Sequence, residues 1–327
     1  RTTIILVLGV TGISFAHPDD HPWRPEQMLD RKDEFERLDD RDLPSPNRFR
    51  AASGEPGPDY WQQQVDYDID VHLDADSNRL IGSEKITYRN NSPHQLHWLW
   101  VQLDQNRFRP DARGKLAERA PDLSGSMSFD NLRRHLDRET FEGGVTIDRV
   151  QTAKGTDLPH VIDGTMMRID LPRPLRPGKS IEFSVAWSYN INNAKVIWGR
   201  TGYEYFEKDD NYLYEIAQWY PRMVAFTDVN GWHHKQFVGR GEFTIEFGDY
   251  RVAITVPSDH IVAATGTLEN PRKVLTKSFR KNPVRASTQS LPLECAMRPY
   301  PVTLTSVLDV LEILNGSNVF YHKLYFL

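Results

Sequence analysis

The sequence contains one cysteine, Cys295, among its 327 residues. An internal disulfide and a C-x-x-C motif are therefore excluded, and a folded domain must be stabilised by its core. Three further patterns are missing: the zinc-binding H-E-x-x-H, the nucleophile motif G-x-S-x-G, and the glycine loops of P-loop and Rossmann nucleotide sites. The chain thus lacks the motifs that mark zinc peptidases, serine hydrolases and nucleotide-binding enzymes.

The charge balance is slightly acidic, with 40 Lys and Arg against 45 Asp and Glu, a net charge of −5 and a pI of about 6.1. Basic residues are scattered, and short runs such as Arg133-Arg134 are typical of solvated surfaces. The sequence therefore predicts no nucleic-acid partner. Hydrophobic residues at 39% and aromatics at 11% suffice for a core in one large domain or two ordinary ones.

The only pronounced apolar run covers residues 2–15, which is too short to span a bilayer as a stable helix. It follows the positive Arg1, and Ser14-Phe15-Ala16 at its end places small residues at the two positions that a signal peptidase reads. We predict a cleaved signal peptide over residues 1–16, and hence an exported protein in a periplasmic or extracellular location. The alternative is a buried strand or helix at the N-terminus.

Residues 17–60 are rich in Asp, Arg and Pro and poor in aliphatic side chains. A short charged helix is possible over residues 26–41, and the prolines after it interrupt regular structure. We predict that this segment is a short N-terminal arm packed over the main domain.

Residues 62–91 carry the clearest structural signal. Apolar and polar side chains alternate from Val65 to Leu73, turn-forming residues follow, and a second alternating run includes Ile86 and Tyr88. Period-two alternation predicts an antiparallel hairpin with one buried face.

Further strands are predicted at roughly ten-residue spacing, and the fold class is mainly β: a saddle-shaped, antiparallel, sandwich-like domain over residues 61–275. A turn is expected from Pro172 to Gly178, and one helix over residues 129–141, where Leu132 and Leu136 share a face. The predicted strands cover residues 97–103, 143–151, 166–171, 180–189, 212–218, 241–247, 251–256 and 261–264.

The composition changes from about residue 277, where acidic residues become sparse and periodicity is lost. Residues 303–314 are compatible with an amphipathic or buried helix. Because local pattern and global fold stop agreeing, we treat residues 276–327 as an atypical tail, with a frameshifted reading as one hypothesis.

Residues 212–222 form the most specific block for a binding site. A strand ending at Gln218 presents an amide that both donates and accepts hydrogen bonds, and Trp219, Tyr220 and Pro221 are placed to wall a pocket. The alternative is a core aromatic cluster with Gln218 capping the strand. No residue is predicted to be catalytic. No residue is predicted to bind a metal either, because adjacent strand residues such as His233 and His234 point to opposite sides of a sheet.

Several blocks together resemble the N-terminal domain of aminopeptidase-N-like zinc metallopeptidases of the gluzincin group, particularly their exported bacterial members. These blocks are YWQQQVDYDIDVHLD, WLWVQLDQNRFRP, GRTGYEYFE, EIAQWYPRMVAF and GEFTIEFGDYRVAITVPSDHIVAATG, within residues 17–275.

The resemblance implies a saddle-shaped β domain that packs on a catalytic domain and forms one wall of its substrate cleft. Family members usually carry Gln-x-Gln or Gln-x-Glu where polar groups hold the free amine of the substrate. Gln218 matches the first position, whereas Tyr220 departs from the second, which puts strict aminopeptidase specificity in doubt. The zinc motif and the exopeptidase loop of the family belong to the following domain.

The resemblance therefore implies a non-catalytic, cleft-shaping domain with no cofactor of its own, inactive alone because nothing in it activates water. Its partners are a peptide substrate, reached through the full-length enzyme, and the missing catalytic domain, where zinc is expected. The alternatives are a stand-alone β-sandwich binding or scaffold module of the cell envelope and an enzyme with an unrecognised site in the β domain.

Overall fold

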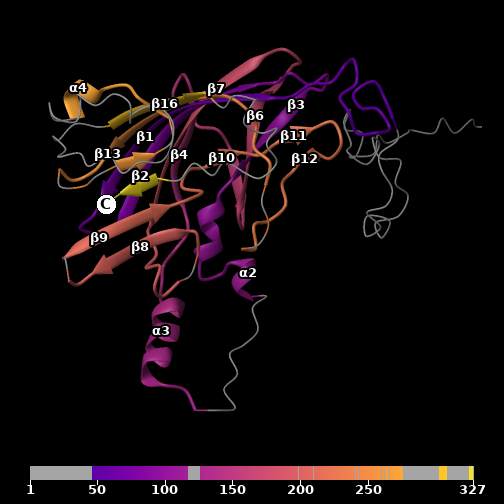
Figure 1. The fold of residues 1–327 in the computed structure, drawn as a ribbon. Helices are drawn as coiled ribbons and strands as arrows, with labels where there is room; N and C mark the ends of the chain where they lie inside the picture. Colours follow the sequence, from indigo (N-terminus) through magenta and orange to yellow (C-terminus); the bar gives the residue numbers. More distant parts are fainter. Residues whose placement is uncertain are drawn as a thin grey trace, which may run out of the picture.

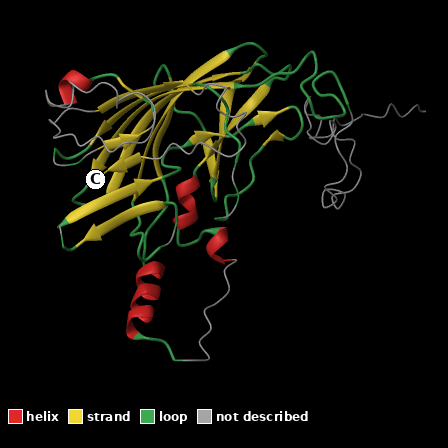
Figure 2. Ribbon diagram, viewed as in Figure 1, coloured by secondary structure: helices red, strands yellow, loops and turns green. Residues whose placement is uncertain are grey.

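The computed structural model describes residues 46–116 and 126–274, apart from residues 198, 209, 240, 242, 259, 261 and 265, together with the backbone of residues 302–307 and 324–326. The predicted signal peptide, the helix over residues 26–41 and most of the atypical tail lie outside these residues. The described part is mainly β and contains several antiparallel sheets (Figures 1 and 2).

The largest sheet forms the long curved layer of the molecule (Figure 1). Its seven strands, in spatial order, are β15 (Thr267–Leu268), β16 (Val302–Val307), β13 (Asp249–Thr255), β1 (Gln64–Asp74), β2 (Arg79–Arg89), β7 (Ser180–Asn190) and β4 (Thr146–Thr152). The predicted hairpin is confirmed as β1 and β2, which pair from Gln64 opposite Arg89 to Asp74 opposite Arg79.

Three smaller sheets complete the β structure. A four-stranded sheet has the order β10 (Arg222–Met223), β3 (Leu96–Gln102), β6 (Met166–Leu175) and β5 (His160–Asp163). Another has the order β14 (Val262–Ala264), β17 (Leu324–Phe326), β9 (Asn211–Ile216) and β8 (Thr201–Phe206). The short strands β11 (Phe226–Thr227) and β12 (Gly231–Trp232) form a two-stranded ribbon.

The helical elements are short: η2, a 3-10 helix (Asp104–Phe108), α2 (Arg113–Leu116), α3 (Phe129–Glu139) and α4 (Pro271–Val274). None of the helices in the described part of the chain is long and apolar enough to cross a bilayer. Helix α3 confirms the helix predicted near residue 129. It begins at a cap in which the Ser128 hydroxyl accepts the Asn131 N–H, and it projects from the body at one end of the molecule (Figure 1).

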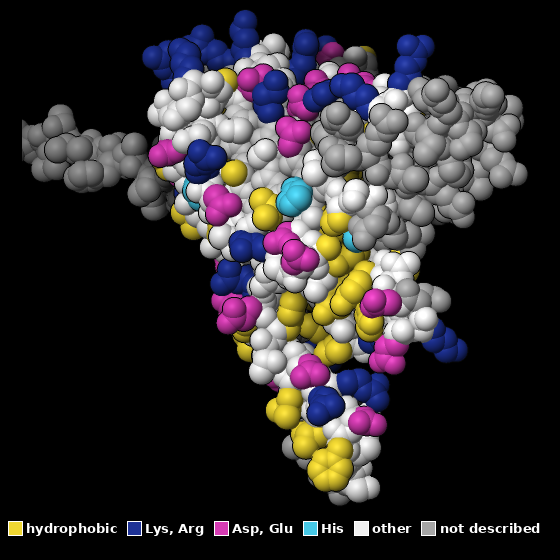
Figure 3. All heavy atoms as spheres, turned by 90° about the vertical axis from the view of Figure 1, so that its left-hand side faces the viewer, with side chains coloured by type: hydrophobic (Ala, Val, Ile, Leu, Met, Phe, Trp, Pro, Cys, Tyr) yellow, Lys and Arg dark blue, Asp and Glu magenta, His cyan; other side chains and the backbone are white. Residues whose placement is uncertain are grey.

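The apolar face of α3 is not covered by the described residues. Phe129, Leu132 and Leu136 are 90%, 43% and 54% exposed, and the neighbouring Leu116 of α2 is 76% exposed. The space-filling view shows hydrophobic side chains at the narrow end of the molecule (Figure 3). Leu132 and Leu136 share a face as predicted, but that face is open to solvent.

The core lies against one face of the seven-stranded sheet. The β1 side chains predicted to face inward are almost fully buried: Val65, Tyr67, Ile69, Val71 and Leu73. They pack with buried aromatic residues such as Trp187 and Trp219. Burying large apolar and aromatic surfaces is the main stabilising contribution available to this chain.

Three sequence predictions are corrected by the structure. For residues 303–314 the sequence was compatible with a helix, but the described part, residues 302–307, forms β16, where the β-branched Val and Thr residues suit an extended strand. The described residues of 241–247 form no strand, since Gly241 has a φ of +108° and only Phe247 makes a bridge, to Gln64.

The third correction concerns β6, which continues through Pro172 and Pro174 to Leu175 instead of turning at Pro172. The β3–β6 register is irregular between Leu96 and Trp98, and proline is tolerated where a ladder is interrupted in this way. In addition, the parallel pairing of β1 with β13 departs from the antiparallel arrangement that the sequence predicted.

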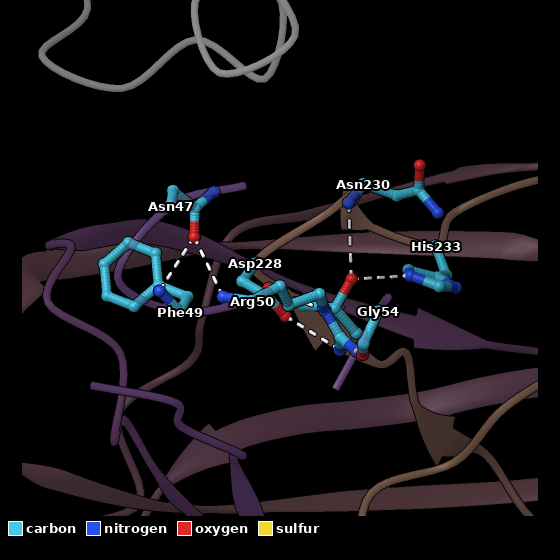
Figure 4. A network of polar contacts seen from close by, with 8 residues as sticks. Asn47, Phe49, Arg50, Gly54, Asp228, Asn230 and His233 are labelled. Atoms are coloured by element: carbon cyan, nitrogen blue, oxygen red, sulfur yellow. Dashed lines mark hydrogen bonds and ion pairs between the residues drawn. The ribbon is translucent and has the colours of Figure 1, made fainter. Parts of the chain in front are cut away.

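The described end of the predicted arm, residues 46–60, is joined to the body by one ion pair (Figure 4). Arg50 donates from Nε and Nη2 to the two carboxylate oxygens of Asp228, at 2.7 and 3.0 Å, and its guanidinium lies 5.1 Å from the ring centre of Tyr60. The Asp228 side chain is only 2% exposed, so this bidentate pair is a specific attachment point.

Candidate functional site

The candidate site is the chain between β9 and β10, residues 217–222, which we call the bend. The predicted strand end at Gln218 is two residues too late, because β9 ends at Ile216. Gln218 has a φ of +53°, in the left-handed region that residues other than glycine seldom occupy. Its side chain is half-buried. Because Gln218 lies beyond the end of β9, the backbone of the bend, and not strand alternation, sets the direction of its amide.

A buried side chain of the 3-10 helix η2 holds this conformation. Gln105, in η2, is 4% exposed, and its Nε2 donates to the carbonyl oxygens of Ala217 at 3.0 Å and Gln218 at 3.1 Å. Two carbonyls that the end of β9 would leave without partners are thereby satisfied. The unusual backbone at Gln218 is therefore fixed by a specific contact.

A buried ion pair fixes the other end of the bend. Arg222 donates from Nε to Asp104 Oδ2 at 2.8 Å, and Gln102 donates to Asp104 Oδ1 at 2.8 Å. The side chains of Arg222 and Asp104 are 9% and 1% exposed. Asp104 and Gln105 are adjacent in η2, so one turn of helix holds both ends of the bend.

The pKa values of both members of this pair are raised, for different reasons. Burial disfavours the charged form of Asp104 and raises its pKa. The nearby Arg222 acts in the opposite direction but does not outweigh burial. Burial acts to lower the pKa of Arg222, but the Asp104 carboxylate and neighbouring groups outweigh it, and the pKa is raised. We take the pair as ionic, because a guanidinium keeps its proton beside a carboxylate at this distance.

The aromatic residues of the bend lie in the core. Trp219 and Tyr220 are 2% and 5% exposed, and the Tyr220 hydroxyl donates to that of Tyr250 at 3.3 Å. Tyr67 meets Tyr220 edge-to-face at 5.4 Å, and its hydroxyl accepts the Met223 N–H at 2.8 Å. Burial raises the pKa of Tyr67 and Tyr220 well above the ordinary range, so both are neutral donors and acceptors.

Of the two predicted contact residues, Gln218 is therefore half-buried at the surface, whereas Tyr220 lies behind it in the core. Substrate contact by either residue stays a prediction. A direct contact with Tyr220 requires its packing against Tyr67 and Tyr250 to open.

Two buried carboxyl groups were missed by the sequence reasoning. Glu84 of β2 lies in register with Ile69 and Val185, and neither of its oxygens has a hydrogen-bond partner among the described residues. Burial raises its pKa well above 4.5. Glu246 accepts the Phe226 N–H at 2.8 Å, and burial raises its pKa to about 8. The sequence contained a signal that could have identified Glu84: it occupies a position of the alternating strand whose side chain faces the core.

The two adjacent histidines make separate local contacts. His233 Nε2 lies 2.9 Å from the Thr227 hydroxyl, and burial lowers the pKa of His233 (Figure 4). His234 Nδ1 lies 2.8 Å from the Trp232 carbonyl, and its ring packs against Trp100 at 4.9 Å. Within the described ranges, no three His, Cys, Asp or Glu side chains are grouped so as to hold a metal ion.

Comparison with known proteins gave no match to a family model and no match among curated proteins. Solved structures are similar at 14% sequence identity. One is an M1 zinc metallopeptidase from Deinococcus radiodurans, with a TM-score of 0.39 and coverage of 83% of this chain and 43% of that chain. Another is a mutant of that enzyme bound to a Tyr-Ser-Ala substrate, with a TM-score of 0.38 and coverage of 83% and 44%.

A third similar structure is a mutant of a two-domain M1 zinc metallopeptidase bound to L-arginine, with a TM-score of 0.38 at 14% identity and coverage of 81% of this chain and 42% of that chain. The chain thus spans less than half the length of the solved chains it matches. At these scores the similarity is too low to establish a family.

Proposed function

We propose that residues 61–275 are the non-catalytic β domain of an aminopeptidase-N-like zinc metallopeptidase, and that the bend shapes one wall of its substrate cleft. Gln218 makes the substrate contact, with Tyr220 packed behind it. The observation that carries this proposal is the left-handed backbone of Gln218, held by Gln105 of the 3-10 helix η2. A strained, well-supported polar residue is more typical of a functional contact than of a chain reversal alone.

The exposed face of α3 supports a partner domain. An eleven-residue helix is marginally stable in water unless its apolar face is buried, yet Phe129 and Leu136 are more than half exposed. In the proposal, the zinc-bearing domain of the same protein covers this face, with export to the periplasm or cell exterior directed by residues 1–16.

No zinc chemistry is assigned to the described residues. They contain no group of side chains suited to a metal ion, so they do not fit the zinc that the family uses. The chain supplied with zinc is therefore expected not to hydrolyse an aminoacyl-4-nitroanilide. Turnover that exceeds that of zinc alone, and copurifies with the protein, would contradict the non-catalytic assignment.

The contact itself is tested by titration calorimetry with the tripeptide Tyr-Ser-Ala, which is the ligand in one of the similar structures. We expect weak binding through the free amine, which N-acetylation of the peptide abolishes. Gln218→Ala should weaken it about ten-fold, the effect of losing one hydrogen bond to a charged group. Gln62→Ala removes an exposed glutamine elsewhere and is the matched control. Equal binding by the two variants would remove Gln218 from the site.

A further inference from the structure

Four tyrosines share one face of the β8–β9 hairpin. In the antiparallel register Tyr203 lies opposite Tyr214 and Tyr205 lies opposite Tyr212. Because side chains alternate along each strand, all four rings project from the same side, and we call them the tyrosine face. The ring centres of Tyr205 and Tyr212 are 4.8 Å apart, and three further pairs of rings lie 6.1 Å apart.

The tyrosine face extends from the core to solvent. Tyr214 is fully buried and its hydroxyl donates to Asn78 Oδ1 at 2.7 Å, whereas Tyr212 at the outer end is 37% exposed. Tyr203 and Tyr205 are half-buried, and the adjacent Phe206 is 41% exposed. Figure 3 views the molecule from the side on which β8 and β9 lie in Figure 1, and shows hydrophobic side chains gathered there beside acidic ones.

Carboxylates lie at both ends of this face. The Tyr205 hydroxyl donates to Asp210 Oδ1 at 2.9 Å at the outer end. At the inner end, the pKa of Tyr214 is raised to about 12. The largest cause is burial, followed by the neighbouring tyrosines and then by Asp74 and Asp76. Among the described residues, Asp74 and Asp76 act electrostatically on Tyr214, and Asp210 and Glu207 act on Tyr205. The His260 ring lies 6.0 Å from the ring centre of Tyr214.

The chain already places one of its own cations over a ring at this edge. Lys195 Nζ lies 5.3 Å from the ring centre of Phe206 and donates to the Tyr205 carbonyl at 2.9 Å. Phe206 follows Tyr205 in β8, so its ring lies on the opposite face of the hairpin and Lys195 does not occupy the tyrosine face. A cation on the tyrosine face would find the rings of Tyr205 and Tyr212 together with the carboxylate of Asp210.

We propose that the tyrosine face binds the cationic side chain, Arg or Lys, of an extended peptide segment. Arg suits it best, because a planar guanidinium stacks on tyrosine rings while donating to a carboxylate. The carboxylates at both ends favour a cation over a neutral sugar, for which an aromatic platform alone would serve. The inference does not depend on the role proposed for Gln218.

The test is fluorescence anisotropy with a fluorescein-labelled Gly-Arg-Gly-Arg-Gly peptide and a matched peptide in which citrulline replaces both arginines. Citrulline keeps the length and planar end group of arginine but is uncharged, with a carbonyl oxygen in place of one amino group. We expect saturable binding of the arginine peptide, at least about ten-fold weaker binding of the citrulline peptide, and several-fold weakening as salt is raised.

Variants locate the site. Tyr212→Ala should weaken binding about five-fold, whereas Tyr212→Phe keeps the ring and should stay within about two-fold. Asp210→Asn should weaken binding about three-fold. Phe129→Ala and Asp163→Asn remove an exposed ring and an exposed carboxylate elsewhere and should have no effect. Thermal unfolding of each variant checks that the fold is retained.

Several outcomes would overturn the proposal: equal binding of the two peptides, no binding of either, or no effect of Tyr212→Ala in a folded variant. Binding of triacetylchitotriose without binding of the arginine peptide would also overturn it, and would identify the tyrosine face as a sugar platform.

Discussion

Replacing Glu246 by Gln should make the protein more stable at neutral pH and remove part of its pH dependence. Glu246 is 8% exposed, and its Oε1 accepts the Phe226 N–H at 2.8 Å. Glutamine has nearly the same shape and keeps an oxygen for this hydrogen bond, but it does not ionise. The substitution therefore isolates the free energy associated with the proton on Glu246.

The magnitude follows from the pKa. Burial raises the pKa of Glu246 from 4.5 to about 8, so between these values the folded chain holds a proton that the unfolded chain has released. Stability is then fully present below pH 4.5 and falls as pH rises, by about 1.4 kcal/mol per pH unit. Over the 2.5 units from 4.5 to 7, the wild type loses about 3 kcal/mol that Glu246→Gln retains.

The assay is urea unfolding followed by tryptophan fluorescence at pH 5, 6, 7 and 8. The free energies of unfolding of the variant and the wild type should be similar at pH 5 and should diverge as pH rises. Glu182→Gln, at an exposed position, is the control and should differ from wild type by less than about 0.5 kcal/mol throughout. A difference between Glu246→Gln and wild type that is the same at every pH would refute the reasoning.

Three further predictions use the same unfolding measurement. Glu84→Leu should stabilise the protein at pH 8 more than at pH 5, because burial raises the pKa of Glu84 and stability is lost as pH rises above 4.5; a pH-independent effect would be contrary evidence. Arg222→Met should cost about 3–5 kcal/mol by leaving Asp104 buried and unpaired, and Asp104→Leu with Arg222→Met should recover most of it; an equally unstable double variant would count against an ionic pair. Gln105→Met should cost about 1–3 kcal/mol, because two carbonyls of the bend lose their donor, whereas the exposed Gln64→Met should be nearly neutral.

Elements with a strong local period were predictable from sequence. Alternation alone placed the β1 side chains from Val65 to Leu73 on the buried face of a hairpin, and the helical spacing of Leu132 and Leu136 located α3. Both signals depend on neighbours within about ten residues, which the sequence displays directly. The same rule did not identify the strand at residues 302–307, because a short apolar run fits a strand as well as a helix.

The site was only partly predictable. The mixed polar and aromatic residues from Gln218 to Tyr220 indicated a candidate site. The alternation of side chains before them did not reveal that β9 ends at Ile216 or that Tyr220 is buried. Those features depend on Gln105, more than one hundred residues earlier in the chain, and on Tyr250, in strand β13 of the seven-stranded sheet.

The sequence by itself determined the β class, the hairpin and its buried face, because alternation is a local property of the chain. Only the tertiary structure decided the parallel pairing of β1 with β13, the left-handed backbone of Gln218, and the charge state favoured for Glu246. Each of these depends on groups far apart in sequence, since pairing, support and desolvation arise when distant segments pack together.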